Sequence, residues 1–121
     1  MSGEHDEQVL LFSKARLYEG QYPELVLLFA IPNGGLRNKV VAKKLKAEGV
    51  KAGVLDVCLP VPRGRYHGLY IEMKYDRNKP TKAQRFWIDA LRLAGHRVEV
   101  CYSGDAAWGV VMDYLTGGEN A

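Results

Sequence analysis

The 121-residue sequence predicts a small α/β domain in which helices surround a central β-sheet. Stretches with helical spacing of apolar residues alternate with short, continuous apolar stretches, in the order helix, strand, helix, strand, strand, helix, strand, helix. The chain is 47% hydrophobic and 26% charged, which is the balance of a globular protein with one core. Because no repeat or long linker divides it, residues 1–121 are expected to form a single domain.

The first part of the chain predicts a helix, a strand and a turn. Apolar residues recur at helical spacing up to residue 19, with Ser2 as a suitable N-terminal cap and Gly20 as a natural end. The continuous apolar run 25–31 predicts a buried strand, although periodicity alone does not separate a strand from a helix here. The sequence Pro-Asn-Gly-Gly at 32–35 then predicts a turn.

A second helix is predicted over residues 39–48, with Asn38 as its N-cap. Val40, Val41 and Leu45 are expected to face the core, whereas lysines lie on the outer side. A glycine ends the predicted helix and leads toward the next strand.

Five more elements complete the prediction. Strands at 54–59 and 69–74 are separated by a loop rich in proline and glycine, so they are expected to pair as an antiparallel hairpin. The third helix, 81–93, begins with a capping-box sequence. A strand at 97–102 and a last helix at 103–115 follow.

Charge is sorted along the chain, although the net charge is only +3. Residues 37–51 carry six basic and one acidic group, and residues 63–97 carry nine basic and three acidic groups. Residues 1–24 and 98–121 are net acidic. If the two basic stretches fold onto one face, that face can attract a polyanion such as nucleic acid; the alternative is a solvated lysine face without a partner.

The composition excludes several classes of protein. With only two cysteines, Cys58 and Cys101, the chain has neither a disulfide scaffold nor a four-cysteine zinc site. No apolar run approaches the ~20 residues of a membrane span, and the beginning of the sequence is too acidic for a signal peptide. We therefore expect a cytoplasmic protein without membrane association.

Three ionisable residues stand out in the predicted hairpin. Side chains alternate across a strand, so Glu72 and Lys74 share one face of strand 69–74, about 7 Å apart, while the alternate apolar residues face the core. Asp56 lies in the preceding apolar strand, where an unpaired carboxylate is costly to bury. If the hairpin aligns Asp56 with Glu72, the two carboxylates can hold one Mg²⁺, with the Met73 backbone carbonyl as a third ligand.

Lys74 would then lie beside that ion, where it can orient an attacking water or help to deprotonate it. Such an arrangement is suited to the hydrolysis of a phosphodiester bond. The same residues allow an alternative, a buried salt bridge between the acids and Lys74 that only closes the hairpin.

The placement of Asp56 before Glu72-Met73-Lys74 resembles the PD-(D/E)xK nuclease pattern, and further motifs resemble one branch of it, the VRR-NUC (virus-type replication-repair nuclease) family. The resemblance extends from about Glu4 to Tyr114. Leu55 stands where a proline is usual, a replacement that is frequent in the wider superfamily. The motifs that carry the resemblance are Glu7-Gln8, Ile31-Pro-Asn-Gly-Gly35, Gly49-Val-Lys-Ala-Gly53 before Asp56, and Thr81-Lys-Ala-Gln84.

The resemblance implies a restriction-endonuclease-like core, that is, a central mixed β-sheet flanked by helices. It implies that Asp56 and Glu72 bind the metal and that Lys74 is the catalytic lysine. It further implies that Glu7 adds an acidic metal ligand from the first helix and that Gln84 contributes to catalysis at the active-site edge. Glu7 and Gln84 also have structural alternatives: Glu7 favours the positive end of its own helix, and Gln84 is the reciprocal partner in the capping box.

The basic stretches flank these residues in sequence and are expected to contact the DNA backbone on either side of a cut, a contact that positions DNA without reading bases. The glycine-rich turn offers backbone N–H groups that can contact phosphate, unless it serves only as a turn. The predicted DNA-binding residues are Asn33, Gly34, Arg37, Lys39, Lys43, Lys51, Arg77, Lys79 and Lys82.

These residues together predict a metal-dependent endonuclease that hydrolyses DNA phosphodiester bonds, with Mg²⁺ as cofactor and Mn²⁺ as a substitute. The resemblance implies homodimers that act on branched DNA such as four-way junctions, in a host cytoplasm if the source is viral. Two sites in a twofold dimer would suit symmetric incision. The alternative is a non-catalytic nucleic-acid-binding module in which Glu72 and Lys74 are structural, and a further one is an interaction protein with no nucleic-acid role.

Overall fold

The structure of the protein is a computed structural model that describes residues 3–32 and 38–117. The order of the predicted helices and strands is confirmed, with one additional short helix, η1. The elements are α1 (Glu4–Tyr18), the 3₁₀ helix η1 (Pro23–Leu27), β1 (Phe29–Ala30), α2 (Lys39–Ala47), β2 (Val57–Leu59), β3 (Leu69–Met73), α3 (Lys82–Leu93), β4 (Arg97–Cys101) and α4 (Gly104–Leu115).

Strands of the described residues form one four-stranded sheet in the order β1-β2-β3-β4. β2 pairs antiparallel with both β1 and β3, whereas β3 and β4 run parallel, so the predicted hairpin and the mixed sheet are both confirmed. Parallel neighbours need a crossover connection, and α3 supplies it between β3 and β4. In the hairpin Val57 lies opposite Ile71, a register that brings Asp56 toward Glu72.

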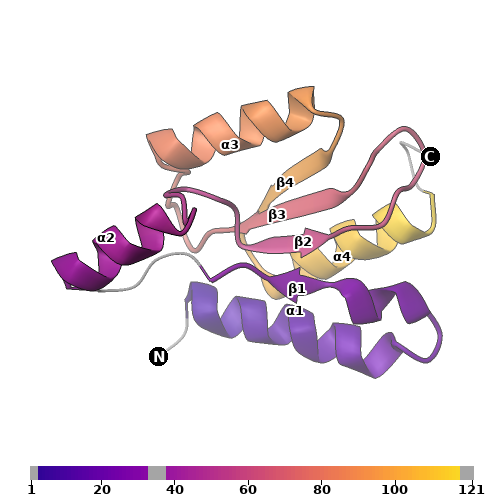
Figure 1. Cartoon of the computed structure of the whole chain (residues 1–121). Helices are drawn as coiled ribbons and strands as arrows, with labels where there is room; N and C mark the ends of the chain where they lie inside the picture. The colour runs from indigo at the N-terminus through magenta and orange to yellow at the C-terminus, as the bar shows by residue number, and fades with distance from the viewer. Residues whose placement is uncertain (1–2, 33–37, 118–121) are drawn as a thin grey trace.

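Helices cover both faces of the sheet (Figure 1). α1 and α4 pack against each other and against one face, and α3 covers the other. Each side has its own core, so β3 is buried on both faces. The larger core includes Leu11, Leu59, Ile71, Met73 and Val111, and the smaller core, under α3, includes Leu55, Ile88 and Val98.

The prediction of a strand over residues 25–31 is wrong for most of that run. Pro23 begins η1 instead, and only Phe29–Ala30 pair as a strand. Proline stabilises the first turn of a helix because its φ angle is already suitable and it has no N–H to leave unpaired. Leu25 and Leu28 are then buried three residues apart, the spacing of one 3₁₀ turn, while the two residues between them are exposed.

α2 extends away from the rest of the molecule (Figure 1). Its predicted cap is confirmed, because Asn38 Oδ1 accepts the N–H of Val41 at 2.8 Å. The expectation that Val40, Val41 and Leu45 face the core is wrong, since no residue of α2 is buried and Val40 is 77% exposed. Spacing shows which side of a helix is apolar, but it does not show whether another part of the chain covers that side.

Helix starts elsewhere follow the predicted caps, with one change near the N-terminus. α3 begins with its capping box and α4 with its serine cap. Gly3 occupies the cap position of α1, because the helix begins at Glu4. The expected cap Ser2, and residues 33–35 of the predicted turn, lie outside the described residues. No helix in the described ranges is both long and apolar enough to cross a membrane.

Candidate active site

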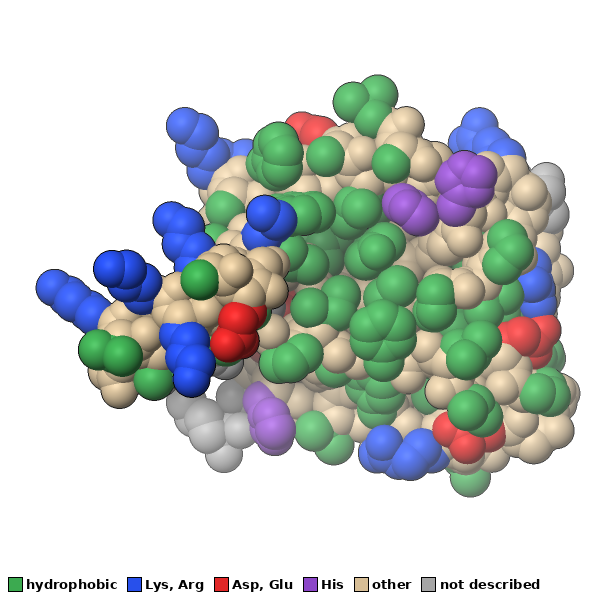
Figure 2. Space-filling model, viewed as in Figure 1, with side chains coloured by type: hydrophobic (Ala, Val, Ile, Leu, Met, Phe, Trp, Pro, Cys, Tyr) green, Lys and Arg blue, Asp and Glu red, His purple; other side chains and the backbone are tan. Residues whose placement is uncertain are grey.

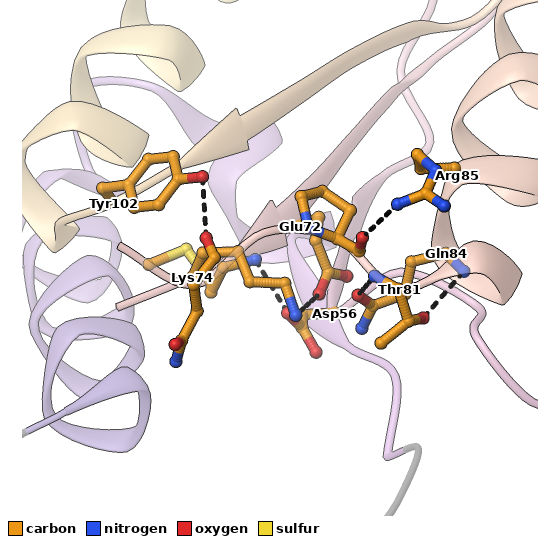
Figure 3. A network of polar contacts seen from close by, with 10 residues as sticks. Asp56, Glu72, Lys74, Thr81, Gln84, Arg85 and Tyr102 are labelled. Carbon is orange, nitrogen blue, oxygen red and sulfur yellow. Dashed lines mark hydrogen bonds and ion pairs between the residues drawn. The ribbon is translucent and has the colours of Figure 1, made fainter. Parts of the chain in front are cut away.

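The predicted acids and the lysine converge where β2 begins and β3 ends (Figure 3). Asp56 immediately precedes β2, and its Oδ2 accepts the backbone N–H of Met73 at 2.7 Å. The Asp56 backbone forms hydrogen bonds to two neighbouring segments. Its N–H donates to Ile71 O at 3.2 Å, and its carbonyl accepts the N–H of Ile31 at 2.7 Å. The neighbouring segments of the sheet therefore fix both the backbone and the carboxylate of Asp56.

Glu72 and Lys74 form an ion pair beside Asp56. Lys74 Nζ lies 3.4 Å from Glu72 Oε2, and the Lys74 N–H donates to Cys101 O at 2.9 Å, which fixes the lysine backbone against β4. Glu72 is only 1% exposed, and its other oxygen, Oε1, is buried with no hydrogen-bond partner among the described residues. A buried carboxylate oxygen without a protein partner is costly, so this oxygen is suited to accept a water or to bind a cation.

Burial raises the pKa values of both carboxyl groups, and like charge raises that of Glu72 further. The pKa of Glu72 rises to about 8, because the group is buried and because the Asp56 charge lies beside it, while the Lys74 ammonium opposes this effect. Burial also raises the pKa of Asp56, against the opposing hydrogen bond from Met73. Two adjacent carboxylates of this kind do not readily ionise together at neutral pH, and a cation that compensates their charge makes it easier.

These features fit a divalent cation with oxygen ligands. Asp56 and Glu72 supply two carboxylates from neighbouring strands, and one of their oxygens has no protein partner in the described structure. Mg²⁺ typically takes one or two carboxylates, with waters and substrate phosphate oxygens in its other positions. Within residues 3–32 and 38–117, no group of three or more His, Cys, Asp or Glu side chains is arranged to hold a metal ion.

Glu7, the predicted third acid, joins α1 to α4. Its Oε1 accepts the N–H of Gly104 at 2.8 Å, at the N-terminus of α4, where a carboxylate also interacts favourably with the helix dipole. A Cβ on Gly104 would lie 2.5 Å from the Glu7 carbonyl oxygen, so the close approach of the two helices requires glycine here. A metal-binding role for Glu7 stays a prediction.

Gln84 takes part in the capping box at the start of α3 (Figure 3). The Gln84 side-chain oxygen Oε1 accepts the Thr81 backbone N–H at 2.8 Å, and the Gln84 backbone N–H donates to Thr81 Oγ1 at 3.1 Å. The structural alternative for Gln84 is therefore confirmed. Because capping uses the amide oxygen, the side-chain NH₂ group stays available for another contact, and a catalytic role for Gln84 stays a prediction.

The segment before Asp56 is anchored on α3 by contacts that have no signal in the sequence pattern. Trp87 Nε1 donates to Ala52 O at 3.1 Å. Gly53 has a φ of 82°, and a Cβ there would lie 2.6 Å from the Cβ of Ala83. Glycine is required at this position for both reasons. The motif that ends in Gly53 was visible in the sequence, but its packing partner on α3 was not.

The segment after Lys74 is anchored by two further contacts that had no sequence signal. Arg85 Nη1 donates to Pro80 O at 2.8 Å, and the Tyr102 hydroxyl donates to Asn78 O at 2.8 Å (Figure 3). Arg85 belongs to α3, and Tyr102 directly follows β4. The elements on either side of the site thus hold this segment in place.

Basic side chains lie on both sides of the site in the chain. Figure 2 shows lysine and arginine side chains gathered over α2, next to a broad apolar face of the main body. The predicted DNA-binding residues Asn33, Gly34 and Arg37 lie outside the described residues. The other six, Lys39, Lys43, Lys51, Arg77, Lys79 and Lys82, are all exposed.

A mixed sheet between helical layers, with two carboxylates and a lysine at its strand ends, defines an α/β protein with a candidate active site. The family model of the VRR-NUC domain matches residues 13–105, so the chain belongs to the VRR-NUC family. A solved structure described as a VRR_NUC domain protein is similar with a TM-score of 0.82 and 28% sequence identity, over 97% of this chain and 91% of that one. A comparison with curated proteins finds no match. The predicted family and fold class are confirmed.

Proposed function

We propose that this protein is a Mg²⁺-dependent endonuclease that hydrolyses DNA phosphodiester bonds. The observation that carries the proposal is the convergence of Asp56, Glu72 and Lys74 around a buried, unpartnered carboxylate oxygen of Glu72 within the described structure. Membership in the VRR-NUC family supports a nuclease. Mn²⁺ is expected to substitute for Mg²⁺, because carboxylate and carbonyl oxygens suit both ions.

In this proposal, Asp56 and Glu72 would hold the cation, with the Met73 carbonyl as a third protein oxygen. When bound, the ion stabilises charge on the phosphate and lowers the pKa of water. Lys74 Nζ lies 3.4 Å from Glu72 Oε2, where its ammonium can orient the attacking water and stabilise the negative charge that develops on the phosphate. Hydrolysis joins the water oxygen to phosphorus and releases a sugar oxygen, which takes up a proton.

The exposed cations around the site would bind the DNA backbone. Lys39 and Lys43 extend from α2, and Arg77 and Lys79 follow β3. Within the described residues none of these four takes part in an ion pair, so their charges are available to phosphates. Contacts of this kind position DNA without reading its bases, so the shape of the DNA is expected to decide which substrates are preferred.

We infer further that the substrate is branched DNA and that the active form is a homodimer. Symmetric incision of a four-way junction needs two cuts, and a twofold dimer supplies two Asp56–Glu72–Lys74 centres in a fixed relation. Exposed apolar side chains, Val26 and Phe29 among them, provide surface that a second copy would bury. Sedimentation analysis should then give twice the chain mass.

Nuclease activity is tested with labelled four-way junction, flap and linear DNA in Mg²⁺, in Mn²⁺ and in EDTA. We expect nicking with either metal and none in EDTA. Lys74→Ala should abolish cutting and leave DNA affinity nearly intact. The matched control is Lys14→Ala on α1, where Lys14 pairs with Asp105 at 3.5 Å, and it should cut like the wild type.

The alternative function is a nucleic-acid-binding module, which the buried ion pair of Glu72 with Lys74 also allows. It would be favoured if the wild type showed no metal-dependent nicking on any substrate. An equal loss of cutting and of DNA affinity in Lys74→Ala would also favour the binding module, because the lysine would then serve only DNA binding or folding.

A further inference from the structure

The segment 75–80 connects Lys74 to α3 and carries two exposed cations, Arg77 and Lys79. In the part of the chain that the structure describes, neither cation forms an ion pair. Surface segments of this kind are usually mobile. Segment 75–80 is instead held by hydrogen bonds at its start, its middle and its end.

Hydrogen bonds to β4 and α3 fix the two ends of the segment. At the start, the Lys74 N–H donates to Cys101 O at 2.9 Å. At the end, Arg85 Nη1 donates to Pro80 O at 2.8 Å, next to the Thr81 cap of α3 (Figure 3). The ends therefore keep their positions as long as β4 and α3 do.

The middle of the segment is a tight turn held by Tyr102. The Asn78 N–H donates to Tyr75 O at 3.1 Å, and Asp76 inside the turn has a φ of 57°. A left-handed conformation is less favourable for aspartate than for glycine, and the hydrogen bonds of the turn help to offset this cost. The Tyr102 hydroxyl donates to the Asn78 carbonyl at 2.8 Å, so both backbone polar groups of Asn78 are bonded (Figure 3).

We propose that Tyr102 is a positioning residue for the substrate, whose hydroxyl holds this turn so that Arg77 and Lys79 meet DNA phosphates next to the one that is cut. The inference rests on the proposed nuclease function and adds a residue to it. Arg77 and Lys79 are the two neighbours of Asn78 in the chain, so fixing Asn78 fixes the backbone from which both cations extend. Cations held in place before DNA arrives lose less conformational freedom on binding, which strengthens the contact.

Tyr102 is 43% exposed, so its ring is also able to stack on a base. Tyr102→Phe separates the two roles, because it keeps the ring and removes only the hydroxyl. The exposed Asn78 carbonyl can then bond to water, so the variant should fold with a melting temperature close to that of the wild type.

The experiment compares KM and kcat of Tyr102→Phe with those of the wild type on the best-cleaved DNA. Loss of one hydrogen bond that orders the cations should raise KM about five-fold and leave kcat unchanged. The matched control is Tyr18→Phe, an exposed tyrosine of α1 whose ring packs on Trp108, and it should leave both constants unchanged. An unchanged KM in Tyr102→Phe overturns the proposal.

A double-mutant cycle then tests whether Tyr102 acts through the two cations. In the background Arg77→Ala/Lys79→Ala, Tyr102→Phe should raise KM no further, because the groups it positions are gone. The same rise in both backgrounds overturns the proposal. If the wild type cuts DNA but Tyr102→Phe behaves like it, only this inference fails, whereas a wild type that cuts no DNA contradicts the proposed function itself.

Hydrogen exchange provides a readout that needs no cutting. Backbone amides of residues 76–79 should exchange faster in free Tyr102→Phe than in free Tyr18→Phe, because the turn has lost its long-range bond. Equal exchange in the two variants would mean that the hydroxyl does not hold the turn, and the proposal would be wrong.

Discussion

Asp56 and Met73 are joined by a hydrogen bond of 2.7 Å, from the Met73 N–H to Asp56 Oδ2. The bond brings the carboxylate to the end of β3, beside Glu72. The strand was predicted to begin at residue 54, but β2 begins at Val57. The same bond offers a reason, because the Met73 N–H donates to the Asp56 side chain and not to the backbone of a facing strand. One contact thus ends the strand pairing and places a functional group.

Replacing Asp56 by asparagine should abolish metal-dependent cutting without unfolding the protein. The asparagine oxygen can still accept the Met73 N–H, but the site loses one of its two negative charges. The rate of cutting should fall by more than the roughly 10–100-fold that is typical when a residue hydrogen-bonded to a metal ligand is replaced. The melting temperature should stay equal or rise, because repulsion of Glu72 is removed. Asp56→Ala is the comparison that also loses the hydrogen bond and should melt lower; near-normal cutting by Asp56→Asn would contradict the metal role.

The raised pKa of Glu72 predicts that the metal-free protein loses stability as the pH rises from about 4.5 to about 8. This pKa is about 8 in the folded protein against an ordinary value of 4.5, so the folded state binds the proton more tightly. The resulting stability is fully present below about pH 4.5 and is lost as the pH rises through about 8. In EDTA, the urea midpoint of the wild type should fall more between pH 6 and pH 9 than that of Glu72→Gln.

Magnesium should reduce this loss of stability in the wild type, because a cation between Asp56 and Glu72 replaces the proton as the compensating charge. Glu72→Gln is the matched control, since the amide has a similar shape and does not titrate. The same pH dependence in the two proteins would show that Glu72 does not hold its proton in the folded state.

Those parts of the fold that depend on local spacing could be predicted from the sequence. Two apolar runs around a loop rich in proline and glycine gave the hairpin, and the register of that hairpin brings Asp56 to Glu72. The caps at Asn38 and Thr81 follow from side chains that accept N–H groups three residues ahead. In each case the partner lies nearby in the chain or is set by strand pairing.

Contacts between distant segments could not be predicted in this way. The Tyr102 hydroxyl bonds to a residue 24 positions earlier, and the Glu7 carboxylate bonds to one 97 positions later. No spacing rule connects such pairs, because they meet only when the helices and the sheet are assembled. The exposure of α2 was not predicted for a related reason. The sequence shows which side of a helix is apolar, but it does not show whether another part of the chain packs against that side.

Gly53→Ala should destabilise the protein and reduce cutting together. Gly53 has a φ of 82°, and an added Cβ would lie 2.6 Å from the Ala83 Cβ, so the segment that leads into Asp56 would move away from α3. We expect a loss of about 1–3 kcal/mol in the free energy of unfolding, measured by urea titration. Gly109→Ala in α4 is the control, because nothing lies within 4 Å of its added Cβ, and alanine should be neutral or stabilising there. A Gly53→Ala protein as stable as the control would contradict the packing contact.

Two substitutions of Gln84 separate capping from catalysis. Glutamate keeps an oxygen for the Thr81 N–H, so the capping box survives, but it replaces the NH₂ group by an oxygen that repels phosphate. Gln84→Glu should melt like the wild type and cut at least about ten-fold more slowly. Gln84→Ala should lose about 0.3–1.5 kcal/mol of stability with its cap. Normal cutting by Gln84→Glu would limit this residue to its structural role.

Removing lysines from α2 should weaken DNA binding in a way that depends on salt. Lys39 and Lys43 are exposed, and in the described ranges neither forms an ion pair. Because each phosphate contact releases counterions, Lys39→Ala/Lys43→Ala should reduce the slope of log Kd against log salt by about 2, measured by fluorescence anisotropy on a junction in EDTA. Lys14→Ala should keep the wild-type slope, since Lys14 already pairs with Asp105. An unchanged slope in the double variant would exclude α2 from the DNA contact, and a wild type without salt dependence would favour an interaction protein that binds no nucleic acid.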